Sequence, residues 1–221
     1  MVRSSRSTTG TEAPRPRSTP PRARARDAAR VFVLSPANVG GVRGALLLRE
    51  GASFELARRL RSEGGAPIGE VFEFVSGLYF RGKLAYARRF APRASVVVTP
   101  NQGLWSIDAR VDVVTLRSFA EVDIHHTERR FVEPLERDAR RIARALPGAQ
   151  VVLLGSIATA KYVEVLARVF GEGLLFPVDF VGRGDMSRGG LLLRAARAGR
   201  ELPYAPVLGA RRHGPRPPKL T

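Results

Sequence analysis

Four short apolar runs constrain the fold of this chain more than any other feature. They are rich in aliphatic residues and end at Gly, Pro or Ser-Pro: VFVL (31–34), SVVVT (95–99), VVLL (151–154) and LLF (174–176). Continuous apolar runs of this length are typical of strands buried on both faces. Two further segments, 70–75 and 111–115, alternate apolar and polar residues and predict edge or antiparallel strands.

Amphipathic patterns fill the gaps between these runs and predict helices. They lie at 53–65, 76–90, 133–146 and 160–170. Pro134 is expected in the first turn of the third helix, and Gly171 is expected to cap the fourth. Strands that alternate with helices predict an α/β fold: a three-layer α/β/α domain with a mainly parallel sheet of about four or more strands.

Composition divides the chain into three parts. Residues 1–29 are dominated by Pro, Ser, Thr and Arg, which predicts a disordered basic N-terminal tail. Such a tail is either merely solvated or a non-specific nucleic-acid-binding arm. Residues 30–209 are expected to form a single α/β domain, and 210–221 a basic C-terminal tail.

The chain has a formal net charge of +17, of which residues 31–209 carry +7. This excess favours a polyanionic partner, either nucleic acid (DNA more than RNA) or a nucleotide. The alternative is that arginine-rich coding reflects base composition, since lysine occurs only at Lys83, Lys161 and Lys219.

The absence of cysteine excludes disulfides, thiolate metal sites and a cysteine nucleophile. The three histidines have no metal-ligand spacing, and no apolar run approaches the roughly 20 residues of a membrane span. We therefore expect no metal, no cofactor and no membrane partner, and a cytoplasmic protein, with nucleoid association as an option. The oligomeric state stays open.

Ligands of open parallel sheets bind beyond the carboxyl ends of the strands. Four loops follow the predicted strands there: 35–41, 100–105, 155–161 and 177–190. Each is rich in Gly, Asn, Ser or Pro, and we expect the four to meet at one site. None contains GxxxxGK[ST] or GxGxxG, which argues against a nucleoside triphosphatase and against a dehydrogenase of the GxGxxG type.

The first two loops offer groups that suit a planar heterocycle. The side-chain amides of Asn38, Asn101 and Gln102 can hydrogen-bond a base edge, and Trp105 can stack on its face. Asp108 follows as a candidate catalytic carboxylate. The alternatives are that Asn38 caps a turn and that Trp105 belongs to the core.

The last two loops offer groups that suit a phosphate. Ser156 and Lys161 precede or open one helix, and Arg183, Asp185, Ser187 and Arg188 surround the start of another, expected near Gly189. Backbone N–H groups at a helix start attract anions, and paired guanidinium groups bind phosphate. Ser187 or Asp185 is expected to cap this helix. The alternatives are a Lys161–Glu164 pair and an Arg–Asp pair within a rigid turn. His125 and His126 are interpreted as surface residues, with a metal or acid–base role as the alternative.

The Asn/Pro/Gly loop after the first strand and SRGGLL at the last helix resemble the uracil-DNA glycosylase-like superfamily of α/β/α proteins. The stretch SGLYFRGKLAYA, with VVVTPNQGLW and VVLLGS, is also similar to small bacterial proteins linked to deazaguanine and DNA modification. The first resemblance implies Asn38 at the position of a catalytic Asp or Asn. The histidine of the last glycosylase motif is missing, so Arg183 or Arg188 would stabilise the leaving group.

The prediction is an enzyme that acts on a base or nucleotide, with hydrolysis of an N-glycosidic bond as the specific reaction. Asp185, Asp108 and Asn38 are the candidate catalytic residues. The alternatives are a non-catalytic DNA- or RNA-binding module and an enzyme for a free phosphorylated metabolite.

Overall fold

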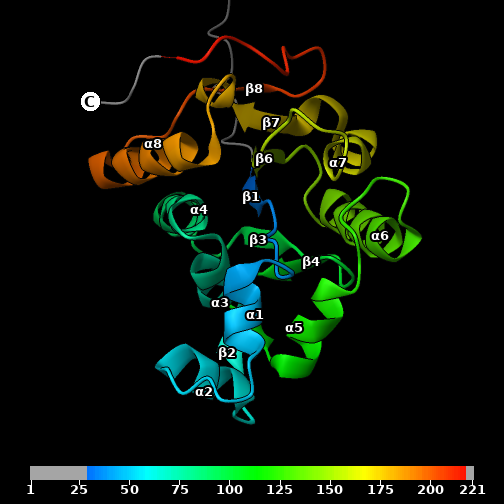
Figure 1. The fold of residues 1–221 in the computed structure, drawn as a ribbon. Coiled ribbons are helices and arrows are strands. Elements are labelled where there is room, and N and C mark those ends of the chain that lie inside the picture. The colour runs from blue at the N-terminus through cyan, green and yellow to red at the C-terminus, as the bar shows by residue number, and fades with distance from the viewer. Residues whose placement is uncertain (1–28, 218–221) are drawn as a thin grey trace, which may run out of the picture.

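A six-stranded sheet with the order β4-β3-β1-β6-β7-β8 forms the centre of the molecule (Figure 1). The structure, a computed structural model, describes residues 29–217. The four inner strands are parallel: β1 (Arg30–Leu34), β3 (Ser95–Val98), β6 (Gln150–Leu154) and β7 (Leu174–Pro177). Antiparallel strands form the edges: β4 (Leu104–Ser106) and β8 (Tyr204–Pro206). The mainly parallel α/β sheet and its four predicted inner strands are thus confirmed.

Alternate side chains of the inner strands enter two separate hydrophobic cores. In β1, Phe32 and Leu34 belong to the core beneath α4 (Leu78–Phe90) and α8 (Asp185–Ala198). Val31 and Val33 belong to the opposite core, beneath α6 (Arg129–Ala145) and α7 (Val163–Phe170). The sheet therefore lies between two layers of helices, because both of its faces are apolar (Figure 1).

A smaller group of elements extends the α4 side of the sheet, in the lower part of Figure 1. Its residues Leu47, Phe72 and Leu116 join the same core as α4 and α8. The group consists of α1 (Val42–Leu48), α2 (Glu55–Arg61), α3 (Ile68–Ser76), α5 (Val113–Ala120) and an antiparallel pair, β2 (Ala66–Pro67) with β5 (Arg110–Val111). Two short 3-10 helices, η1 (Gly171–Gly173) and η2 (Val178–Phe180), flank β7.

Two strand predictions are wrong. Residues 70–75 lie in α3, where Ile68, Val71 and Phe72 are buried at i, i+3 and i+4, the spacing of one helical face. Residues 111–115 begin in β5 but turn into α5, because Asp112 caps the helix by accepting a hydrogen bond from Thr115 N at 2.7 Å.

Three helix starts also differ from the predictions. α6 begins at Arg129, so Pro134 lies inside the helix and not in its first turn. α7 begins at Val163, and Gly171 ends it at φ +52°, as predicted. α8 begins at Asp185, after Gly184, and no side chain caps it, so the predicted capping by Ser187 or Asp185 is wrong.

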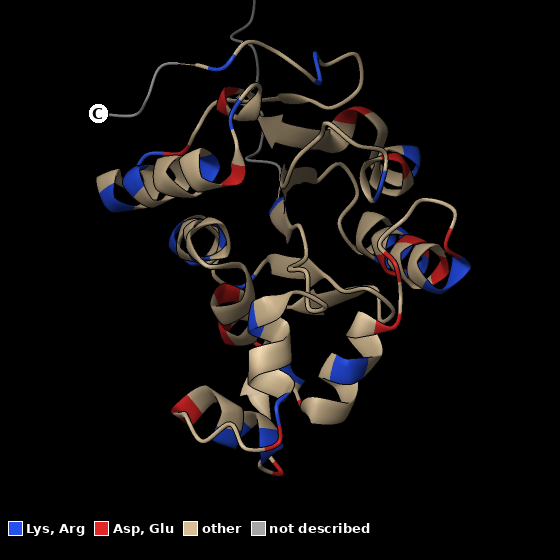
Figure 2. Cartoon of the chain, viewed as in Figure 1, with Lys and Arg blue, Asp and Glu red and all other residues tan. Residues whose placement is uncertain are grey.

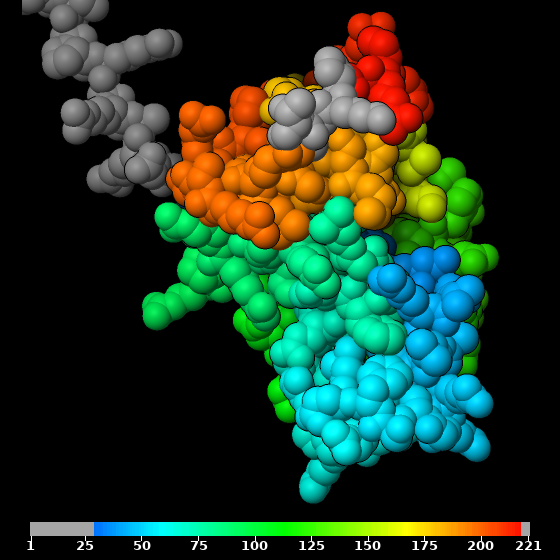
Figure 3. Space-filling model, turned by 60° about the vertical axis from the view of Figure 1, so that its left-hand side comes forward, coloured from blue at the N-terminus to red at the C-terminus, as the bar shows by residue number. Residues whose placement is uncertain are grey.

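Two glycines explain how closely α8 packs on α4. A Cβ on Gly189 would lie 2.6 Å from Leu78 O, and a Cβ on Gly82 would lie 2.5 Å from Gly189 O. These glycines let the backbones of α4 and α8 touch, and the two helices pack side by side (Figure 3). Gly189 therefore serves helix packing and lies within α8.

The predicted N-terminal tail lies outside the described residues, apart from Ala29. Residues 210–217 form no helix or strand, and 218–221 lie outside the described part. Between residues 29 and 217, none of the helices combines the length and apolarity that a membrane span requires.

Candidate functional site

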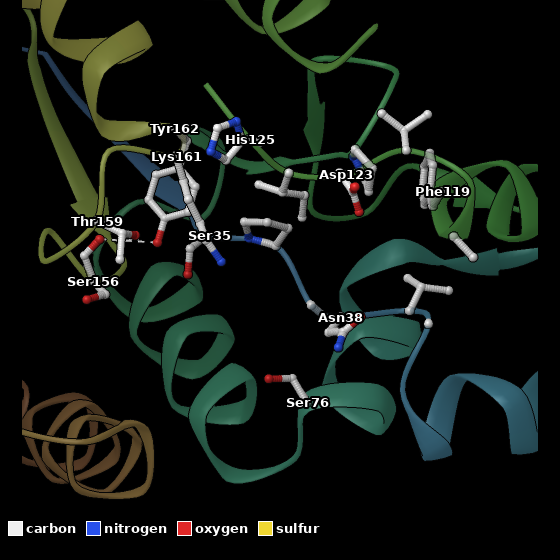
Figure 4. A pocket seen from close by; sticks show the side chains of 18 of the residues that line it. Ser35, Asn38, Ser76, Phe119, Asp123, His125, Ser156, Thr159, Lys161 and Tyr162 are labelled. Atoms are coloured by element: carbon white, nitrogen blue, oxygen red, sulfur yellow. Dashed lines mark hydrogen bonds between the residues drawn. The ribbon is translucent and has the colours of Figure 1, made fainter. Parts of the chain in front are cut away.

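A cavity of about 870 Å³ opens where the chain connections diverge at the carboxyl edge of the sheet. The connection after β1 leads to β3 on one side, whereas the connection after β6 leads to β7 on the other. Such a switch point between neighbouring parallel strands is the usual ligand site of an open α/β sheet. Residues from the loops after β1, β3 and β6 and from the start of α8 line the cavity. Figure 4 shows the side chains from the loops after β1 and β6, among them Ser35, Asn38, Ser156 and Lys161.

Five of the predicted site residues line this cavity. They come from two loops and one helix: Asn38, Ser156, Lys161, Asp185 and Arg188. Asn38, Lys161 and Asp185 are exposed, whereas Arg188 is buried. Segments up to 150 positions apart are thus brought to one place by the parallel topology.

Asn101 and Gln102 lie instead in a neighbouring hollow against α6, together with Arg130 and Arg137. The Asn101 amide donates to Ser118 O and Oγ at 3.0 and 3.1 Å, which fixes this loop to α5. Only Pro100 of this loop lines the switch-point cavity.

Trp105 and Asp108 do not line the cavity, because β4 runs antiparallel to β3 and carries the chain away from the carboxyl edge. Trp105 packs on Phe119 with ring centroids 6.0 Å apart, which matches its interpretation as a core residue. Asp108 follows β4 toward the opposite edge and pairs with Arg88 at 3.1 Å. The structure thus separates both residues from the predicted site.

Arg183 and Ser187 form a local pair near the start of α8 and do not line the cavity. Arg183 Nη1 donates to Ser187 Oγ at 3.2 Å, and its Nε donates to Asp179 O at 3.0 Å. Both residues therefore hold the turn before the helix.

Arg188 combines a structural role with a place in the cavity wall. Its Nε and Nη2 donate to Phe180 O at 3.2 Å, and its Nη1 lies 3.3 Å from Asp185 Oδ1. The Arg–Asp pair considered as an alternative is therefore present. Because Asp185 is exposed and Arg188 is buried, an anionic ligand can replace the carboxylate beside the guanidinium group.

Residues that the sequence did not single out lie at the base of the cavity and directly behind it. Lys83 of α4 is 1% exposed, and its Nζ donates to Ser35 O at 2.7 Å and lies 2.9 Å from Ser35 Oγ. Burial lowers the pKa of Lys83 to about 7, and the charge of Asp185 opposes this shift. One feature of the sequence could have identified Lys83: it lies on the apolar face of a helix, between Phe80 and Leu84, where a charged residue is unusual.

Two tyrosines complete the base of the cavity. The Tyr79 hydroxyl is buried and has no hydrogen-bond partner among the described residues. Burial raises the pKa of Tyr79, so its hydroxyl stays protonated and can donate. Tyr162 Oη donates to Ser156 O at 3.2 Å, and burial raises its pKa too.

Gly155 makes room for this arrangement. A Cβ at this position would lie 2.8 Å from Ser35 Cβ and 3.0 Å from Tyr162 Oη. Glycine therefore allows the ends of β1 and β6 to bring Ser35 and Tyr162 together.

At the rim of the cavity, His125 Nδ1 lies 2.8 Å from Thr127 Oγ1, and its ring packs on His126 at 4.3 Å. Over residues 29–217, no three His, Asp or Glu side chains are grouped so that they could hold a metal ion.

No protein-family model, curated protein or solved structure matches this chain. The resemblance to the uracil-DNA glycosylase-like superfamily stays a prediction, and function has to be inferred from the cavity.

Proposed function

We propose that this chain is a hydrolase that acts on a nucleotide unit, free or within nucleic acid, bound in the switch-point cavity. The observation that carries the proposal is the convergence of Arg188, Lys161 and Asn38 on one cavity of about 870 Å³. That volume lies within the range of small-molecule sites, roughly 300–1,000 Å³.

One end of the cavity suits a phosphate. Arg188 and Lys161 supply positive charge, and the N-terminus of α8 presents backbone N–H groups that no side chain caps. The buried Tyr79 hydroxyl is a further donor without a partner. An unpaired buried donor is unfavourable, and a bound anion would satisfy it.

The other end suits a base. Asn38 is exposed at the cavity and carries an amide that can pair with a base edge. Phe119, Pro36 and Ile124 provide apolar surface beside it. A few polar groups on a partly apolar wall are typical of sites for planar ligands.

The resemblance noted above favours the N-glycosidic bond as the bond that is hydrolysed. Cleavage of such a bond calls for a carboxylate near the sugar, and Asp185 and Asp123 both line the cavity. Asp185 is the predicted catalytic residue that the geometry supports best. A phosphoester bond is the second candidate, favoured by the cationic end of the cavity.

The distribution of charge favours binding in the cavity and not on a basic surface of the molecule. Lys and Arg are interspersed with Asp and Glu over the helices (Figure 2). On α6, for example, Arg129 pairs with Glu133 and Arg140 with Glu136. A non-catalytic nucleic-acid-binding module would need a more continuous basic face.

Calorimetric titration with nucleoside monophosphates, the matching nucleosides and inorganic phosphate tests the proposal. We expect a monophosphate to bind more tightly than its nucleoside. Lys161→Gln should weaken monophosphate binding about tenfold, roughly 1.4 kcal/mol, and leave nucleoside binding unchanged. Arg168→Gln, at an exposed position of α7 outside the cavity, is the matched control. Equal loss in both variants, or no binding at all, would contradict the proposal.

Product analysis then identifies the bond. Release of a free base from the nucleotide or from uracil-containing DNA supports glycosidic hydrolysis, and release of phosphate or of a nucleoside supports phosphoester hydrolysis. Intact substrate after long incubation with a protein that binds it would contradict an enzymatic function.

A further inference from the structure

We propose that Ser35 is a nucleophile and Lys83 its general base, and that the pair attacks a phosphoester of the nucleotide unit. This inference rests on the proposed function with its second candidate bond, the phosphoester, and names the residues that break it.

Ser35 lies between Lys83 and the cavity. Ser35 directly follows β1, lines the cavity and is 5% exposed (Figure 4). Lys83 lies behind it and is not part of the cavity wall, so its amine reaches the cavity through Ser35. The 2.9 Å separation of Nζ and Oγ is a hydrogen-bond distance, as a nucleophile and its base require.

The surroundings of Lys83 favour the neutral amine. Lys83 is fully buried and forms no ion pair among the described residues, and this outweighs the attraction of the Tyr79 and Phe80 rings, 4.5 Å from Nζ, for the charged form. The titratable groups around it are Tyr79 of α4, Tyr162 at the start of α7, and Asp185 and Arg188 of α8. Burial is the main cause of the lowered pKa of Lys83, and at a pKa of about 7 a large fraction of its amine is neutral at physiological pH.

A neutral Lys83 can use both of its contacts at once. One N–H donates to Ser35 O at 2.7 Å, which orients the amine. Its lone pair then faces Ser35 Oγ at 2.9 Å and can accept the hydroxyl proton.

The reaction balances without a further co-reactant. Ser35 Oγ forms a bond to phosphorus while its proton moves to Lys83 Nζ, and the bond from phosphorus to the leaving alcohol oxygen breaks. The leaving oxygen lies on the far side of phosphorus and takes a proton from a water molecule, and the hydroxide that remains attacks the phosphoserine. Ser35 Oγ then leaves and takes its own proton back from the Lys83 ammonium group. The sum is phosphoester plus water giving phosphate plus alcohol.

The cavity also holds groups for the charge that develops. Arg188 and Lys161 can stabilise the phosphoryl oxygens, and the protonated Tyr79 hydroxyl can donate to one of them. Such fixed donors account for most catalysis of phosphoryl transfer.

Labelling of the full-length chain with a fluorophosphonate, read by peptide mass mapping, tests the pair independently of the natural substrate. We expect a covalent adduct on Ser35 and a labelling rate that rises with pH and levels off above pH 7. Lys83→Met and Lys83→Arg should both slow labelling at least about 100-fold, because neither side chain can act as a base. Ser76→Ala removes another cavity serine and should leave the rate unchanged.

The pH profile of the wild-type chain tests the proposal even if the Lys83 variants do not fold. No adduct on Ser35, a rate independent of pH between 5 and 9, or unchanged labelling in folded Lys83→Met would overturn it. Ser35→Ala should abolish labelling and keep monophosphate binding. Labelling of Ser35 in a chain that binds no nucleotide would refute the proposed function but would still support Ser35 as a nucleophile with Lys83 as its base.

Discussion

Lys83 occupies a position that an apolar residue would normally fill. It projects from the buried face of α4 and contacts Ser35 across 48 positions of sequence. Because its pKa is lowered to about 7 in the folded chain, compared with about 10.4 in an unfolded one, the unfolded state binds more protons above pH 7. The contribution of Lys83 to the free energy of unfolding is therefore lowest below pH 7 and rises as the pH approaches 10.

We predict that the free energy of unfolding of the wild-type chain rises by about 2 kcal/mol between pH 7 and pH 9, relative to Lys83→Met. Urea denaturation of both proteins at the two pH values measures the difference. Parallel changes in the two proteins would show that Lys83 titrates in the folded state as it does in the unfolded state.

Tyr79 allows a second test at this scale. Tyr79→Phe removes a buried hydroxyl that has no partner among the described residues, so we expect the free chain to be as stable or up to about 1 kcal/mol more stable. Monophosphate binding should weaken several-fold, because the donor is lost. Thermal unfolding with and without the monophosphate measures both effects. A less stable free chain with unchanged binding would contradict this role.

The sequence was sufficient to bring together those candidate residues that follow an inner strand or open a helix. The common location of Asn38, Ser156 and Asp185 could be predicted because the carboxyl ends of parallel strands share one edge. Asp108 could not be placed, because the turn between β3 and β4 and the reversal of the chain carry no distinct pattern. Nor could Ser35 and Lys83 be paired, because their contact depends on how α4 packs on β1.

At the scale of elements, the crossing of α4 and α8 determines the shape of the cavity. α4 carries Tyr79 and Lys83, and α8 carries Arg188, so the approach of the two helices at Gly82 and Gly189 sets the distance between these groups. From sequence, the paired glycines of SRGGLL were only part of a Gly-rich loop that was expected at the site. Their role became clear only from the helix that lies opposite.

We predict that Gly189→Ala destabilises the chain by about 1–3 kcal/mol, because its Cβ would meet Leu78 O at 2.6 Å. The neighbouring Gly190→Ala is the matched control: its Cβ would find nothing closer than 3.8 Å, and it should stabilise α8 by about 0.5–1 kcal/mol. Chemical denaturation of both variants decides the point. Equal stabilities would mean that the helices do not cross at Gly189.

The helices and strands themselves were predicted unevenly, for a physical reason. The inner strands are short apolar runs bounded by Gly or Pro, and α6 and α7 have a clear helical stripe, so each pattern favours one structure. α3 has apolar residues at i, i+1, i+3 and i+4, and in six residues this pattern also fits an alternating strand. Only the position of α3 in the same core as α4 resolves the ambiguity.

For the whole molecule, the net charge and the cavity make separate contributions to binding. Residues 1–28 hold seven arginines and two acidic residues, whereas the cavity belongs to residues 35–188. We predict that deletion of residues 1–28 makes oligonucleotide binding less salt-dependent. The slope of the logarithm of the binding constant against the logarithm of the salt concentration should decrease in proportion to the phosphate contacts that are lost. Calorimetry at several salt concentrations should also show unchanged binding of a nucleoside monophosphate. A parallel loss of monophosphate affinity would contradict this separation.

A crystal structure of the Ser35→Ala chain with a bound nucleoside monophosphate tests the central claim most directly. We expect the phosphate beside Arg188 and Lys161, within hydrogen-bond distance of Tyr79 Oη, and the base toward Asn38. A nucleotide seated in the neighbouring hollow, against Asn101 and Arg137, with the switch-point cavity empty, would contradict the account.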